Sequence, residues 1–329
     1  MNQTLTHCLL KPLAVLAALT FTSVGFAQAA WPNAKPIRIV VSYAAGGGAD
    51  TLIRMLAPKL GESLGQTIVI ENRAGAGGII GGDAVAKSAP DGYTFLMDAA
   101  SHGINPTLAA KMPFDTLKDL APVSLIAVVP NVLAVHPSFP AQTPAELIAL
   151  IKKNPGKYAF GSAGIGSVQH LAGELLKAQA GLFLVHIGYR GGAPAMADLM
   201  ANQIPMYFGS MASATPNLRS GRMRPVALTG ATRSASFPNV PTLKESGFPT
   251  FEAYEWNAVF APAGTPSAIT ERMAREINKV MQLPEIKERF AGLSADGVGS
   301  MPAELEAFRR ADIAKWAEVI KKQNIKSGD

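Results

Sequence analysis

The sequence predicts an α/β protein with two lobes joined by two long strands, and three patterns carry this prediction. Segments typical of strands and helices alternate through residues 36–99. A strand, a glycine-rich loop and a helix follow one another again at 158–181. Two long apolar segments, 119–137 and 251–264, can cross from one unit to the other. Alternating strands and helices favour a parallel sheet covered by helices.

The first unit is expected to hold three strands separated by two helices. The expected strands are 36–43, 66–72 and 93–99, and the expected helices are 50–65 and 77–92. In the first helix, Leu52, Met55, Leu56 and Leu60 recur at helical spacing and share one face. The next segment, 119–137, is apolar and rich in β-branched residues, with Pro130 in its middle. Because proline breaks the ladder of a central strand, we expect this strand to bend there and leave the first sheet.

A second α/β unit follows, and its first helix is well marked. Thr143 is placed to cap this helix, Pro144 to occupy its first position and Glu146 to complete a capping box. Short strands are expected within 158–162, 183–192, 204–210 and 223–230, and C-terminal helices that return to the first lobe at 266–281 and 303–322. The predicted boundaries are 1–29 for a signal peptide, 30–131 and 252–329 for lobe 1, and 132–251 for lobe 2. Ligands tend to bind in the cleft between such lobes.

The first 29 residues have the three parts of a secretory signal peptide. Lys11 precedes an apolar core, and Ala27-Gln28-Ala29 forms an A-x-A cleavage signal. The core is shorter than the about 20 apolar residues that a membrane-spanning helix needs, so we expect a soluble exported protein. Cys8 is the only cysteine and would leave with this segment. Disulfides, thiolate catalysis and cysteine-based metal sites are therefore excluded in the mature chain.

Composition indicates a folded protein with a sizeable core. Hydrophobic residues make up 48% of the chain and charged residues 16%, unlike the composition of disordered segments. The net charge of +6 is spread thinly along the sequence. The sequence has no basic stripe with interleaved aromatic residues, so we expect no nucleic-acid partner.

Three glycine-rich loops, 43–50, 73–83 and 160–170, each lie between an expected strand and an expected helix. Glycines there allow a tight turn and leave the first N–H groups of the helix free to point outward. Those N–H groups and the helix dipole can bind an anion without a charged side chain. The first and third loops hold equivalent places in the two lobes, which favours them as the anion site. The alternative is that these glycines serve only turns and close packing.

The second loop has a partial dinucleotide-binding pattern. Gly75, Gly77 and Gly81 follow a strand, and Asp98 lies about 20 residues further on, as in nucleotide-binding folds. The spacing is G-x-G-x-x-x-G, however, and not G-x-G-x-x-G. A secreted nucleotide-cofactor protein or enzyme that uses the 75–81 loop is therefore the second hypothesis.

The sequence lacks a catalytic constellation. It contains no G-x-S-x-G motif, which excludes the nucleophile elbow. The histidines outside the signal peptide (His102, His136, His170 and His186) form no metal-binding pair, and the carboxylates Asp50, Asp83 and Asp198 suit helix starts and faces. We therefore expect a protein that is not an enzyme and needs no cofactor or metal.

Several segments resemble one family. They are "IVVSYAAGGGADTLIRMLAPKLGESLGQTIVIENRAGAGGIIGGDAVAKSAPDGYTF", "GSAGIGSVQHLAGELL", "HIGYRGGAPAMADLMANQIPMYF" and "RPVALTGATRSASFPNVPTLKESGFP". The sequence is similar to the Bug-type (TctC-like) receptors of tripartite tricarboxylate transporters from Trp31 to the C-terminus. The resemblance implies a type II periplasmic binding protein, a monomer whose two lobes close on a small carboxylate. It also implies delivery to the membrane subunits of such a transporter.

The resemblance further implies which residues bind the ligand. The matching positions are Tyr43, Ala44, Ala45, Gly46, Gly47 and Asp50 in the first loop, Ser101 and His102 after the third strand, and Ser162, Ala163, Gly164, Gly166, Ser167 and His170 in the third loop. Backbone N–H groups near Gly47 are expected to hold one carboxylate, with help from the hydroxyls of Ser162 and Ser167.

Two departures from the family pattern bear on the ligand. The first loop reads "SYAAGG" where many members have "PF-P-P-G-G", and Phe208 is followed by Gly209 and Ser210 where many members have Phe-Asp. Loss of that carboxylate argues against amino-acid ligands and is expected to open space. Gly209, Ser210 and Trp256 are therefore also expected to bind the ligand. With Tyr43, Tyr254 and Trp256 near the hinge, it suggests a ring-bearing dicarboxylate of the phthalate type, unless these aromatics are hinge packing. A ligand-sensing partner of a receptor would use the same pocket.

Overall fold

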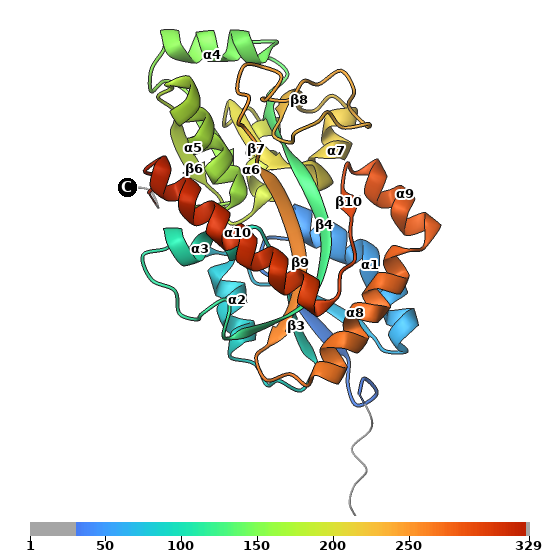
Figure 1. Ribbon diagram of the computed structural model, residues 1–329. Coiled ribbons are helices and arrows are strands. Elements are labelled where there is room, and N and C mark those ends of the chain that lie inside the picture. Colours follow the sequence, from blue (N-terminus) through green and yellow to red (C-terminus); the bar gives the residue numbers. More distant parts are fainter. Residues whose placement is uncertain (1–30, 327–329) are drawn as a thin grey trace, which may run out of the picture.

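The computed structural model describes residues 31–326, and the predicted signal peptide lies outside the described residues. Within them, ten strands form a curled sheet in the order β2-β1-β3-β9-β4-β7-β5-β6, with β8 and β10 also paired to β4 (Figure 1). The strands are β1 (Ile37–Val41), β2 (Ile68–Asn72), β3 (Thr94–Ala99), β4 (Leu120–Val135), β5 (Ala159–Ser162), β6 (Val185–Gly188), β7 (Met206–Ser210), β8 (Arg224–Leu228), β9 (Tyr254–Pro262) and β10 (Asp296–Gly297).

Helices cover both parts of this sheet. They are α1 (Gly48–Leu64), the 3-10 turn η1 (Ala76–Gly78), α2 (Ile79–Ala86), α3 (Ser101–Leu108), α4 (Pro144–Lys153), α5 (Val168–Ala180), α6 (Gly192–Met200), α7 (Met211–Arg219), α8 (Ser267–Met281), α9 (Pro284–Gly292) and α10 (Pro302–Lys322). Among the helices of residues 31–326, none is long and apolar enough to cross a membrane.

The sheet has two halves that share β4. The first half contains the parallel strands β2, β1 and β3, followed by β9 and the beginning of β4 in antiparallel pairing. The second half contains the end of β4 with β7 and β8 in antiparallel pairing, and β5 parallel to both β7 and β6. The predicted parallel βαβαβ arrangement is confirmed in the first half. Helices α8 and α10 pack on that half, against α1 and α3.

β4 changes partners at the expected proline. Pro130 is its last residue paired with β9, and Asn131 is the first paired with β7. The strand runs on without interruption, and Figure 1 shows β4 and β9 side by side along the length of the molecule. Proline has no backbone N–H to donate to a neighbouring strand. At Pro130 this missing donor lies where β4 ends its pairing with β9 and begins its pairing with β7, so it interrupts neither ladder.

Local signals explain several helix starts. Thr143 Oγ1 accepts from the N–H of Glu146 at the start of α4, as predicted, while Glu146 accepts from Gln142 N–H, one residue before the cap.

Helices α3, α6, α7 and α9 were not predicted. They are only 8 or 9 residues long, and α3 and α7 contain Pro106 and Pro216. Such short helices depend on tertiary packing more than on their own sequence.

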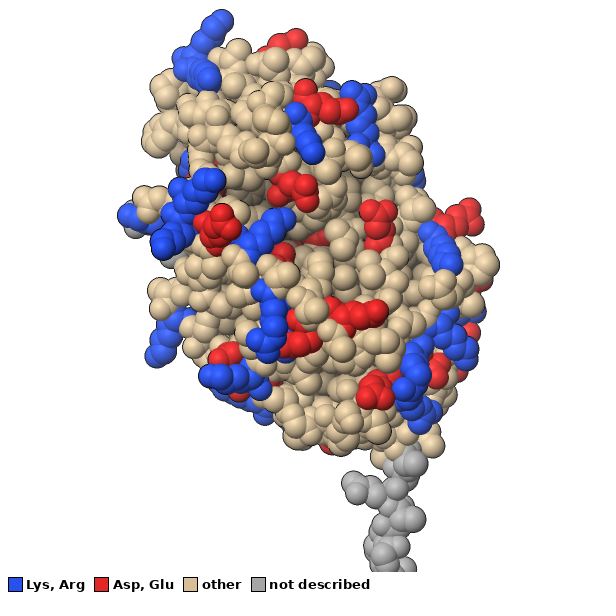
Figure 2. Space-filling view, in the orientation of Figure 1, with Lys and Arg blue, Asp and Glu red and all other residues tan. Residues whose placement is uncertain are grey.

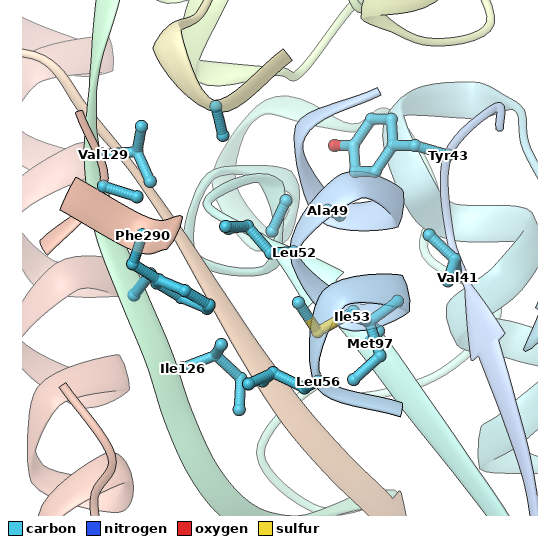
Figure 3. Close-up of a cluster of buried hydrophobic side chains, with 14 of the residues drawn as sticks. Val41, Tyr43, Ala49, Leu52, Ile53, Leu56, Met97, Ile126, Val129 and Phe290 are labelled. Carbon is cyan, nitrogen blue, oxygen red and sulfur yellow. The ribbon is translucent and has the colours of Figure 1, made fainter. Parts of the chain in front are cut away.

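The core of the first half is built on the predicted face of α1. Leu52, Leu56 and Leu60 of that face and the neighbouring Ile53 are at most 1% exposed, whereas Met55 is only half-buried against the same core. Figure 3 shows Leu52 and Leu56 directed toward Ile126, Val129 and Phe290, with the Tyr43 ring beside the first turn of α1. This packing fixes where α1 begins, and therefore where its free N–H groups lie.

The packing of α5 gives a first prediction. A methyl group at Gly173 would overlap the Phe160 ring on β5, so Gly173→Ala should lower the free energy of unfolding by about 1–3 kcal/mol despite alanine's better helix propensity. A methyl group at Gly292, at the end of α9, meets no described atom within 4 Å. Gly292→Ala is the matched control and should leave stability unchanged or slightly raised. Urea unfolding measures both; equal stabilities would contradict the tight α5–β5 contact.

Candidate ligand-binding site

A small cavity lies between the two halves of the sheet. The first half contributes Tyr43, Gly47, Gly48, Ala49, Ala99, Glu255 and Asn257, and the second contributes Ala163, Gln169, Gly192, Tyr207, Ser210 and Ser213. Its volume is about 20 Å³, which is room for about one water molecule. Of the described residues that line it, none is Lys, Arg or His, and Glu255 is the one carboxylate.

Three helix N-termini meet at this cavity. α1 begins at Gly48, α6 at Gly192 and α7 immediately after Ser210, and all three of these residues line the cavity. The first N–H groups of each helix have no partner within the helix, and the helix dipole places partial positive charge there. These helix starts can hold an anion although no described lining residue is a cation.

Unusual polar side chains face the same space. Ser210 Oγ, Tyr207 OH, Gln169 Oε1 and both amide atoms of Asn257 have no hydrogen-bond partner among residues 31–326. These four lining residues are at most 5% exposed. A buried polar atom without a partner costs about 1–3 kcal/mol. Concentration of such atoms around one cavity is typical of a site that a polar ligand completes.

Glu255 on β9 is the most perturbed acid of the site. Its Oε1 accepts from Ala100 N–H at 2.8 Å and its Oε2 accepts from Gln169 Nε2 at 2.6 Å. Burial raises the pKa of Glu255 to about 7, and the nearby charge of Asp98 adds to the increase. Gln169 also donates to Asn131 Oδ1 at 2.8 Å. It thereby ties α5 of the second half to both long strands.

Loops of the two halves also touch one another, mostly outside the cavity lining. Ala44 N–H donates to Arg190 O at 3.3 Å. A Cβ at Gly77 would overlap the Ile165 carbonyl, and one at Gly48 would lie 2.8 Å from Ser210 Oγ. Bare backbone at these positions lets the halves approach this closely. In this structure the halves are closed on one another.

Four of the residues expected to bind the ligand line the cavity, namely Tyr43, Gly47, Ala163 and Ser210. The others do not: Ala44, Ala45, Gly46, Asp50, Ser101, His102, Ser162, Gly164, Gly166, Ser167, His170, Gly209 and Trp256. Several of these polar residues are engaged in holding loops together. Asp50 accepts from Gly46 N–H at 2.8 Å and from the Arg54 side chain. Ser101 Oγ accepts from Tyr43 OH at 2.7 Å and so positions that ring.

The histidines and the third-loop serines have structural partners. His102 Nδ1 lies 3.1 Å from Asp98 Oδ2. Ser162 Oγ bonds to His186 Nε2 at 2.7 Å, and Ser167 Oγ caps α5 by accepting from His170 N–H. The His170 ring stacks on His186, and burial lowers its pKa to about 3, so it stays neutral. These contacts hold the serines and histidines outside the cavity lining, whereas Ala163 and Gln169 of the third loop line the cavity.

The aromatic residues of the hinge also lie outside the cavity. Trp256 Nε1 donates to Asp312 Oδ2 at 2.9 Å, and Tyr254 OH accepts from Ala231 N–H at 2.7 Å. Gly209 does not open space, because a Cβ there would overlap the Tyr207 ring and hydroxyl. The Tyr207 phenol therefore fills the volume that a larger residue at 209 would need.

Sequence reasoning missed Gln169, Tyr207, Glu255 and Asn257. A signal was present for two of them, because Glu255 and Asn257 are polar residues on alternate positions of an otherwise apolar strand and so share one face. The second glycine loop, in contrast, contributes no residue to the cavity. A Cβ at Gly81 would lie 2.8 Å from Ser42 Cα, so that glycine serves close packing.

Comparisons with known proteins agree with this fold. The family model for the "Tripartite tricarboxylate transporter family receptor" matches residues 52–325. Protein BugT of Bordetella pertussis is 39% identical over 295 residues, which cover 89% of this chain and 90% of BugT. The periplasmic binding protein BugD has a TM-score of 0.87 at 33% identity, covering 89% of this chain and 99% of BugD. A protein from R. palustris solved with adipate has the same TM-score and identity, covering 90% and 99%.

These findings confirm the predicted fold class and family. The solved relatives include a periplasmic binding protein that covers nearly all of the described residues at high structural similarity. The receptor family and the periplasmic binding protein among its solved members imply that receptors of this group are located in the periplasm. The chain belongs to the receptor family of tripartite tricarboxylate transporters.

Proposed function

We propose that this protein captures a small carboxylate in the cavity between the halves of its sheet and delivers it to the membrane subunits of a tripartite transporter. The observation that carries this proposal is the convergence of three helix N-termini on one buried cavity. Free N–H groups and helix dipoles suit a carboxylate. In this proposal the protein works in the periplasm as a monomer and is not an enzyme. The described lining offers N–H groups suited to an anion and contains no acid–base pair arranged around a reacting atom.

Capture requires the two halves to move apart. A cavity of about 20 Å³ holds about one water molecule and cannot admit a dicarboxylate. We propose that residues 30–131 with 252–329 form one lobe and 132–251 the other, and that β4 and β9 bend where they pass between them. The ligand would enter the open form, and closure would bury it against donors from both lobes.

The preferred ligand class is an aliphatic dicarboxylate. A relative of known structure was solved with adipate, a linear dicarboxylate. The hypothesis of a ring-bearing acid rested partly on Tyr254 and Trp256, which do not line the cavity. Tyr43 and Tyr207 do line it, so a phthalate-type acid is the second candidate and belongs in the same experiment.

A thermal-shift screen of the mature protein against aliphatic and aromatic mono-, di- and tricarboxylates tests this proposal, with amino acids and NAD as controls. A ligand at about 100 times its Kd stabilises the folded protein by about 2.7 kcal/mol, which raises Tm by several degrees. We expect the largest shift from a linear dicarboxylate. A shift from NAD alone would favour the nucleotide hypothesis instead.

Substitution of Ser210 at the end of β7 and of Ser162 at the end of β5 gives a sharper test. Ser210→Ala removes a hydroxyl that has no partner among the described residues, so it should weaken ligand affinity about tenfold and leave the stability of the ligand-free protein unchanged. Ser162→Ala is the matched control. It removes bonds to His186 and Gly164 N–H, so it should lower stability by about 1 kcal/mol and leave affinity unchanged. Isothermal titration and urea unfolding measure the two effects, and the reverse pattern would place the ligand at the third loop.

A further inference from the structure

Glu255 faces the proposed ligand with a negative charge that has no counter-charge in the cavity. It lies on β9, is 6% exposed, and lines the space into which the helix N-termini point. Its hydrogen bonds come from a backbone N–H and a side-chain amide. Within residues 31–326, no Lys, Arg or His side chain lines the cavity. The role of this carboxylate is thus not explained by an ion pair.

The groups around Glu255 do not supply a positive charge. β3 brings Asp98, which is held by Ser42 Oγ at 2.7 Å and by His102 Nδ1 of α3 at 3.1 Å. The loop before α1 brings Tyr43, and β7 brings Tyr207. Burial is the main cause of the raised pKa of each of these two phenols, so both stay neutral across the physiological range.

The elements behind β9 are separated from the cavity. α10 directs Asp312 to Trp256 Nε1, on the opposite face of the strand from Glu255. Arg309 of α10 donates to the carbonyl oxygens of Thr116 and Leu120. α5 presents the neutral Gln169, and β4 presents the neutral Asn131. The nearest charge that acts on Glu255 is therefore another carboxylate, Asp98.

A carboxylate ligand would add a further negative charge to this closed space. Two carboxylates in one buried site cannot both stay ionised cheaply unless a cation lies between them. A proton on Glu255 removes the repulsion between the two carboxylates. The resulting O–H group can donate a hydrogen bond to an oxygen of the ligand carboxylate. The Glu255 pKa of about 7 makes this proton available from water near neutral pH.

We propose that Glu255 is a ligand-contacting residue that takes up one proton from solvent when the halves close on a carboxylate, and releases it when they open. The proposal rests on the function proposed above and adds that one proton is bound and released together with the carboxylate. It also makes Glu255 a specificity residue, because an acid in its neutral form favours a ligand oxygen, whereas an ionised one favours an ammonium group.

The sign of the pH dependence follows from the raised pKa. In this closed structure, the pKa of Glu255 lies above its ordinary value of 4.5, at about 7. Its contribution to stability is therefore fully present below about pH 4.5 and is lost as pH rises through about 7. Binding that needs the protonated form should weaken about tenfold per pH unit above the pKa that Glu255 has in the open protein, and therefore at every pH above about 7.

Isothermal titration with adipate between about pH 5.5 and 8.5 tests the proposal. Each titration is made in two buffers of different ionisation enthalpy, which counts the protons taken up without any variant. We expect an uptake that approaches one proton per ligand above about pH 7 and an affinity that falls there about tenfold per pH unit. Glu255→Gln, a neutral mimic of the protonated acid, should bind with an affinity that does not change with pH. The exposed Glu252→Gln is the matched control and should behave like the unmodified protein.

Each other outcome has a distinct meaning. An affinity that is flat with pH and no proton uptake would overturn the role of Glu255 while leaving carboxylate capture intact. An affinity for amino acids that rises through about pH 7 would overturn it in favour of an ionised Glu255 that holds an ammonium group. Failure of adipate and the other carboxylates to bind at any pH would contradict the proposed function itself, and the proton uptake with it.

Discussion

The site depends on a close approach of backbone to backbone across the gap between two halves of one sheet. Ala44 N–H reaches the Arg190 carbonyl, and Gly77 faces the Ile165 carbonyl with no room for a Cβ. Larger residues at Gly77 would hold the halves apart. The close approach buries the polar lining and brings the first turns of α1, α6 and α7 to one cavity. The glycine loops thus serve close packing, and the first of them also brings the start of α1 to the cavity.

The recognition proposed for this cavity relies on helix dipoles and neutral hydrogen-bond donors rather than on a side-chain cation. On the face shown in Figure 2, Lys and Arg side chains are interspersed with Asp and Glu over the surface. The lining, as far as residues 31–326 describe it, has no cation at all. Oriented N–H groups are fixed in place by helix packing, so they need little reorganisation when an anion arrives. Gln169 couples this arrangement to the long strands through Asn131 and Glu255. Hydrogen bonds in such a buried network strengthen one another.

Much of the fold could be predicted because its signals are local. Buried strands, the apolar face of α1, the Thr143 cap and the change of partners at Pro130 each follow from a few neighbouring residues. The site could be predicted only in part. The first loop brings Tyr43 and Gly47 to the cavity, but Tyr207 reaches it because Gly209 leaves room for its ring. Ser162 turns to His186 instead, a contact between β5 and β6. Such choices arise from tertiary contacts between distant segments.

A crystal structure of the protein with adipate would test the central claim most directly. The account predicts a widened cavity with a carboxylate within about 3 Å of backbone N–H groups at the starts of α1, α6 and α7. It also predicts that Ser210 and Asn257 become hydrogen-bonded to the ligand or to water bound beside it. A ligand held at the 75–81 loop, or against Ser162 and Ser167 without contact to those helix N-termini, would contradict it.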